Sequence, residues 1–204
     1  MSIVRVILDK DVTEANIGSV AWDLQWSLGD FTKAEGTTPK QAIFYTREME
    51  KDGEAEEKIF IRYTEDFYID LPYIEVCGEN PSLIKLVVED IRDCLTTYTV
   101  PEAFEMVKNA KDREELFLAI RYLGIGCGGY PMTPELLELF EKLAQDPDPE
   151  IRETTIIAMV YAGAAELEDI FEKVAQSDPH EEVRAHAARS LERLREYVIN
   201  KSAS

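Results

Sequence analysis

A near-repeat in the last third of the chain constrains its fold most strongly. A segment beginning at Phe140 reads Phe-Glu-Lys-Leu-Ala-Gln and continues through an Asp-Pro turn to Arg152. The same order begins again at Phe171 and reaches Arg184, 31 to 32 positions later. A fixed period in this range is typical of stacked helical units, each of which buries its apolar face only against its neighbours. The repeat therefore predicts a helical solenoid, and such surfaces usually bind other proteins.

Strand signals end near Pro101, and the rest of the chain indicates helices alone. The Asp-Pro pairs at 146–147 and 178–179 end helices sharply, and Pro134 follows the capping residue Thr133. The Gly-rich stretch 124–131 has no preceding strand and no Gly-Lys-Ser/Thr ending, so we interpret it as a helix-to-helix connection. The helices predicted in this way cover 102–109, 112–124, 134–145, 150–162, 166–176 and 181–198.

The turn and the helix after it resemble the HEAT-repeat pattern of an Asp-Pro turn, an arginine and spaced small residues. Residues 146–152 carry it first, and 178–184 carry it more closely. The resemblance covers 134–198 and extends to 111–124, and the same short form occurs in phycobilisome lyases. Spaced residues in the helix after each turn carry the resemblance: Thr155, Ala158 and Met159 after the first turn, and Ala187, Ala188, Ser190 and Leu191 after the second. A similar spacing occurs earlier in the chain at Ala119, Tyr122 and Gly124.

The motif residues have a structural explanation. Asp146 and Asp178 can each cap the helix after their turn, and Arg152 and Arg184 can reach the preceding turn. Stacked units would then share a ladder of Asp–Arg contacts, while the small residues let helices pack closely. We therefore interpret these four residues as structural.

The resemblance also implies a binding surface, because the second helix of each HEAT unit lines the concave side. The positions away from the apolar stripe are Glu153, Thr154, Ile157 and Tyr161 in one helix, and Ala185, His186, Arg189 and Arg193 in the next. We predict that Tyr161, Thr154, His186, Arg189 and Arg193 contact a partner. The alternative is that the two arginines only pair with Glu192 and Glu196 on a solvated helix.

The first hundred residues indicate a small α/β unit with the element order β-α-β-β-β-α. Apolar, β-branched runs predict strands at 3–8, 41–47 and 58–63, and another within 66–77 with Pro72 at an edge or bulge. Asp52-Gly53 predicts a hairpin turn. One helix is expected from Glu14 to Leu28, ended by Gly29, and another from 80–82 to Leu95. This order suggests a sheet of three or four strands.

The first predicted helix carries Trp22 and Trp26 one turn apart, nearly opposite its other apolar face. A helix that is apolar on two faces is either sandwiched between layers or exposes a binding surface. In the first case the helical half covers the tryptophans, and in the second they are partner contacts.

The chain is strongly acidic, with a formal net charge of −19. Basic against acidic residues number 10 to 20 in residues 1–100 and 12 to 21 in 101–204, so the excess is spread over both halves. Such a field repels phosphate backbones and anionic lipid, and it attracts a basic partner. Solubility is the simpler explanation. No stretch approaches the length of a membrane span, no leader pattern follows Met1, and the three cysteines are expected to be reduced, so we predict a cytoplasmic protein.

No nucleophile, metal-ligand or phosphate-loop motif is present, so we expect no catalytic residues, metal or cofactor. The sequence therefore predicts an α+β protein: an α/β domain at 1–100 and a HEAT-like stack at 101–204. The leading hypothesis is a non-enzymatic protein–protein interaction module, in its most specific version an immunity-type inhibitor of a basic partner. The alternative is a HEAT-like lyase or ligand-handling protein that binds a small molecule between its two halves, near Cys127 or Tyr130.

Overall fold

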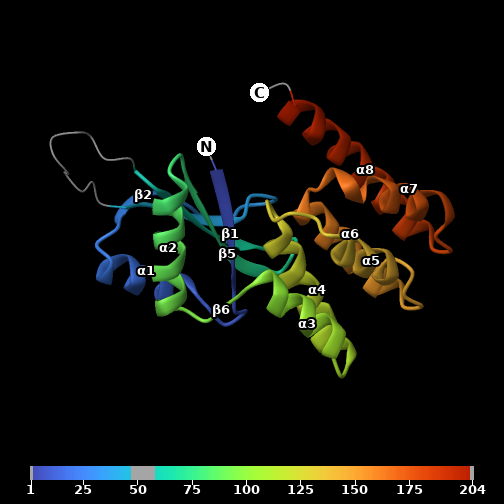
Figure 1. The fold of residues 1–204 in the computed structure, drawn as a ribbon, viewed down its shortest axis with the longest axis horizontal. Helices are drawn as coiled ribbons and strands as arrows, with labels where there is room; N and C mark the ends of the chain where they lie inside the picture. The colour runs from blue at the N-terminus through green and yellow to red at the C-terminus, as the bar shows by residue number, and fades with distance from the viewer. Residues whose placement is uncertain (1, 47–57, 203–204) are drawn as a thin grey trace. The chain divides into compact units, whose positions relative to one another are not determined.

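The computed structural model describes residues 2–46 and 58–202, and side chains as far as residue 196. The chain divides into two compact units, Met1–Thr99 and Val100–Ser204. The first holds an antiparallel sheet and the second a stack of helices (Figure 1), which confirms the predicted α+β class. The hairpin turn predicted at Asp52-Gly53 lies outside the described residues.

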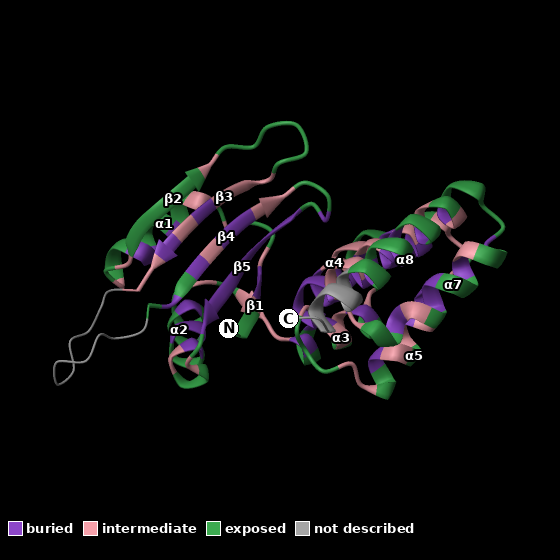
Figure 2. Cartoon of the chain, turned by 90° about the horizontal axis from the view of Figure 1, so that it is seen from above, coloured by how far each residue is buried: buried purple, intermediate pink, exposed green. Residues whose placement is uncertain are grey.

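Within the described residues the sheet has six strands in the order β2-β3-β4-β5-β1-β6, all antiparallel. The prediction of three or four strands is therefore wrong, because it lacks β2 and the two-residue β6. The strands are β1 (Ser2–Leu8), β2 (Ser27–Thr32), β3 (Lys40–Tyr45), β4 (Phe60–Asp66), β5 (Leu71–Gly78) and β6 (Thr97–Tyr98). Figure 2 shows β5 buried along its length and β2 exposed.

The predicted first helix is too long, because α1 (Glu14–Asp23) ends before Leu28 and β2 follows. Gln25 adopts a left-handed conformation with φ of 58°. Its N–H donates to Trp22 O at 3.1 Å, and the N–H of Trp26 donates to Ala21 O at 2.7 Å. This pair of bonds closes a helix, usually with glycine at the left-handed position. Because glutamine occupies it here, the sequence carries no stop signal.

Two further details of the sheet differ from expectation. Gly29 does not end a helix but lies at the irregularity of β2 between Leu28 and Asp30. Pro72 lies in β5, an interior strand, and not at a sheet edge. It pairs with Glu65 of β4 and stands one residue beyond the last β1 partner, Tyr73, so it interrupts no pairing with β1.

The core of the first unit lies between the sheet and the helices α1 and α2 (Pro81–Cys94). The strand register places alternate residues of β1, β3, β4 and β5 on one face, where they meet the apolar stripes of both helices. Asn80 caps α2 by accepting hydrogen bonds from the N–H groups of Ser82 and Leu83. The buried cluster includes Val6, Leu8, Ile17, Ala21, Ala42, Ile61, Tyr63, Ile74, Val76, Ile84, Val88 and Ile91.

The second unit is helical throughout. Its elements are α3 (Val100–Asn109), α4 (Arg113–Cys127), α5 (Pro134–Leu143), α6 (Pro149–Ala162), the 3₁₀ turn η1 (Ala165–Leu167), α7 (Glu168–Ser177) and α8 (Glu181–Ser202). Helices pack as consecutive pairs, and α6 also packs against α4 and α8. In the described part of the chain, every helix is too short or too polar to span a bilayer.

The predicted Gly-rich connection begins too early, because α4 continues through Cys127. Gly124 lies inside this helix against α6, where a Cβ atom would stand 2.5 Å from Ala158 Cα and 2.9 Å from Ala158 O. Glycine is a weak helix former, but here it permits two backbones to approach closely. Packing against α6 therefore overrides local preference at this position.

Candidate functional site

The turns before α6 and α8 are built by aspartates. Asp146 Oδ1 accepts the N–H of Asp148 at 2.8 Å, and Asp178 Oδ1 accepts the N–H of His180 at 2.8 Å. The cap of α6 is Asp148, which accepts the N–H of Glu150, and not Asp146 as expected. An aspartate carboxylate that accepts a hydrogen bond from the backbone N–H two residues later closes a turn. Both aspartates of the repeat therefore fix turn geometry.

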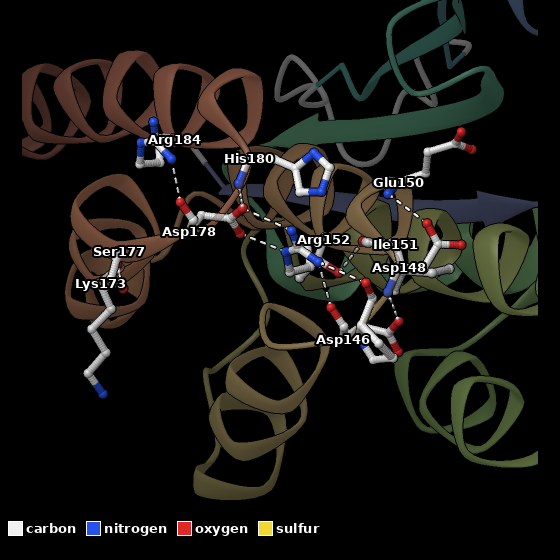
Figure 3. A network of polar contacts seen from close by, with 12 residues as sticks. Asp146, Asp148, Glu150, Ile151, Arg152, Lys173, Ser177, Asp178, His180 and Arg184 are labelled. Carbon is white, nitrogen blue, oxygen red and sulfur yellow. Dashed lines mark hydrogen bonds and ion pairs between the residues drawn. The ribbon is translucent and has the colours of Figure 1, made fainter.

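Arg152 joins these two turns (Figure 3). Its Nε and Nη2 donate to Asp178 at 2.6 and 2.9 Å, and its Nη1 donates to Asp146 O at 2.7 Å. The side chains of Arg152 and Asp178 are only 5% and 3% exposed. A buried guanidinium stays charged when a carboxylate and carbonyl groups satisfy its donors. The contact therefore links one repeat to the next.

The other arginines of the ladder are less enclosed. Arg113 Nε donates to Asp148 Oδ2 at 2.6 Å, and its side chain is half exposed. Arg184 Nη1 donates to Asp178 O at 2.6 Å. Sequence reasoning missed Arg113, although it precedes Arg152 by the same 39 positions that separate Ala119 from Ala158.

The Arg152–Asp178 contact also determines how acid acts on this unit. Burial alone would raise the pKa of Asp178, but hydrogen bonds from Arg152 and from the His180 N–H outweigh it and lower the pKa below the usual value of 3.8. The folded state therefore holds the carboxylate ionised at pH values where the unfolded chain binds a proton.

We expect the stability that Asp178 contributes to be complete above about pH 4, near which an unfolded aspartate titrates, and to be lost as the pH falls through the lowered pKa. Chemical denaturation from pH 6 to pH 2 measures this loss. Asp178→Asn should lower stability at pH 6 and flatten the dependence below pH 4. An equally steep dependence in the variant would assign the acid sensitivity to other carboxylates.

The predicted contact surface lies on α6 and α8. Tyr161 is partly exposed, whereas Thr154 is only 7% exposed, so Thr154 is wrong as an accessible contact. His186 Nδ1 lies 3.4 Å from Glu153 Oε1 and thereby bridges the two helices. We call the residues Glu153, Tyr161, His186, Arg189 and Arg193 the α6–α8 strip.

The strip is locally positive on an acidic protein. Burial lowers the pKa of His186, and the charges of Arg189 and Arg193 lower it further against the opposing Glu153. Both arginines are exposed, and neither forms an ion pair with any side chain that the structure describes. The expected alternative, pairing with Glu192 and Glu196, is therefore not observed in that part of the chain.

The two tryptophans do not form a pair. Trp22 lies on α1 and is 84% exposed. Trp26 follows the helix and packs against the core, with its ring 6.2 Å from that of Phe44. The interpretation of one helix with two apolar faces is therefore wrong. Of the two tryptophans, only Trp22 remains an exposed candidate for a partner contact.

The residues of the lyase alternative differ in accessibility. Cys127 is 1% exposed, and desolvation raises the pKa of its thiol to about 12. Such a thiol is a poor attachment point, because the thiolate is the nucleophile. Tyr130 is 41% exposed. The described residues contain no cluster of His, Cys, Asp and Glu that could hold a metal ion.

Comparison with known families identifies HEAT repeats at residues 136–202, as predicted, and the match does not extend into the N-terminal unit. HEAT repeats commonly mediate protein–protein interactions, which supports this class for the C-terminal unit. Neither the curated proteins nor the solved structures contain a match to the chain.

Proposed function

We propose that this protein is a non-enzymatic protein–protein interaction module whose contact surface is the α6–α8 strip. The observation that supports the proposal is the pair of exposed arginines on α8, Arg189 and Arg193, together with the partly exposed Tyr161 on α6, all within the HEAT-repeat match. Arginine and tyrosine are enriched among the residues that dominate binding energy at interfaces. A carboxylate of the partner would find two guanidinium groups whose charges no neighbour in the described chain neutralises.

A finer proposal concerns the partner as a whole. The net charge of −19 supports a partner with a basic surface, as for an immunity-type inhibitor of a toxin or nuclease. The acidic surface would attract the basic partner over long range. The positive strip would then fix the partner's orientation by binding one of its acidic side chains. Trp22 is a second proposed contact, because its large exposed ring lies on a helix face otherwise formed by the small residues Ala15, Gly18 and Ser19 and is available to a partner.

The strip is tested by reversing its charge. We expect Arg189→Glu combined with Arg193→Glu to weaken capture of the partner from native cells by at least about tenfold. The melting temperature should change little, because both side chains are exposed and form no ion pair with the described part of the chain. Quantitative mass spectrometry of the captured proteins, with a binding titration of the main one, measures the effect.

The matched control is Lys85→Glu with Arg92→Glu on α2, which changes the net charge equally at exposed positions of the other unit. This variant should retain capture. Equal loss in both variants would show that only net charge matters, and undiminished capture by the strip variant would contradict the proposed surface. A captured partner without a basic surface would contradict only the finer proposal.

A further inference from the structure

A groove of about 600 Å³ opens between α5 and α7 in the second unit. The last turns of both helices and the two aspartate turns line it, and Arg152 with Asp178 lies at its wall. Its volume is in the range of sites that accept small ligands or single side chains. Figure 3 shows Arg152 between Asp146 and Asp178, with the Lys173 side chain extending away from these three residues.

Part of the groove is apolar. Ala144 and Val174 are 5% and 7% exposed, and Pro147 and Pro179 come from the two turns. These side chains offer methyl, methylene and ring carbon atoms without hydrogen-bonding groups. Such walls suit the aliphatic stem of a long basic side chain, which packs along apolar surface while its head remains solvated.

The polar part of the groove favours a cation. Two helix C-termini end there, and each carries partial negative charge. Among the described residues, Asp146 Oδ2 accepts no hydrogen bond, since only Oδ1 is used by the turn. Three carboxylates and two cations line the groove, and one of these cations, Arg152, is bound to Asp178.

One of the groove carboxylates, Glu141, already binds a cation, the ammonium group of Lys173. Its Nζ lies 2.7 Å from Glu141 Oε1, with the two side chains 65% and 44% exposed. An ion pair so exposed holds its members weakly, because water and salt screen it. An incoming guanidinium can therefore replace the ammonium, and its planar fork matches a carboxylate better than a point charge does.

We propose that this groove binds one arginine side chain of a basic partner protein. The stem lies against Val174 and the prolines, and the guanidinium takes Glu141 from Lys173 and reaches Asp146. The site is separate from the α6–α8 strip, so either can exist without the other.

The test is a titration of the ¹⁵N-labelled full chain at low salt with the capped tripeptide acetyl-Gly-Arg-Gly-amide. Saturable shifts are expected in the last turns of α5 and α7, with a dissociation constant in the millimolar range for one side chain. Glu141→Gln should weaken binding at least about threefold through loss of a charge-assisted hydrogen bond. Lys173→Ala should strengthen it by removing the competing cation.

The matched control is Glu138→Gln, the same charge change on a residue of α5 outside the groove, which should bind as the native chain does. Thermal melts establish that each variant is folded. Equal shifts with acetyl-Gly-Gln-Gly-amide, shifts spread over the acidic surface, or no effect of Glu141→Gln would overturn the proposal. Arg189→Glu with Arg193→Glu should leave tripeptide binding intact, which separates this test from that of the strip.

Discussion

Replacing Arg152 by alanine is expected to lower the free energy of unfolding of the helical unit by about 3–5 kcal/mol, because it leaves a buried carboxylate without its partner. The side chain of Asp178, only 3% exposed in the native chain, would keep a single backbone donor, the His180 N–H. The carbonyl groups of the turn before α6 would lose their donor as well. Denaturant unfolding followed by circular dichroism measures the change.

Arg113→Ala is the matched control, since Arg113 likewise pairs with an aspartate before a later helix but is exposed. It should change stability little, because solvent and salt screen its ion pairs. A double-mutant cycle of Arg152→Ala with Asp178→Ala isolates the pair, and removing both partners should cost less than the sum of the single changes. Additive effects, or equal effects at 113 and 152, would show that burial does not govern this ladder.

The second large effect is expected at Gly124. Gly124→Ala places a Cβ 2.5 Å from Ala158 Cα, and a backbone atom cannot rotate away as the end of a side chain can. Overpacking of this kind costs about 1–3 kcal/mol and sometimes more, since helices must separate to relieve it. A thermal melt of the variant should show the loss as a lower midpoint.

Gly18→Ala provides the opposite expectation with the same chemical change. Gly18 lies in α1, and a Cβ atom added there would meet no described heavy atom within 4 Å outside its own stretch of helix. Alanine should therefore stabilise that helix by roughly 0.5–1 kcal/mol through backbone entropy. A neutral Gly124→Ala would mean that α4 and α6 can move apart without cost.

Local signals predicted much of the second unit. The helix start at Thr133 follows from a capping residue and a proline, which act within one turn of the chain. Amphipathic spacing likewise predicts α2, whose buried residues lie on one stripe. These features depend on neighbours in sequence, so no knowledge of the fold is needed.

The predictions from sequence were wrong where contacts with distant residues, or an unusual backbone conformation, determine the local structure. Gln25 takes a left-handed conformation normally given to glycine, so the end of α1 and the existence of β2 were missed. Gly124 stays helical because Ala158 of another helix lies against it. Trp22 and Trp26 separate into one exposed and one packed ring as a result of the same early helix end.

The stack of HEAT repeats in the C-terminal half could be predicted from the sequence alone, because each repeat contains its own turn, helix cap and apolar stripe within a short segment. The burial of Arg152 and the exposure of Arg113 emerged only from the folded chain, although each arginine pairs with an aspartate before a later helix. That Arg189 and Arg193 have no ion-pair partners among the described side chains was likewise evident only from the folded chain. Burial and pairing are properties of what lies opposite a residue in space, and a periodic sequence does not specify which unit covers which.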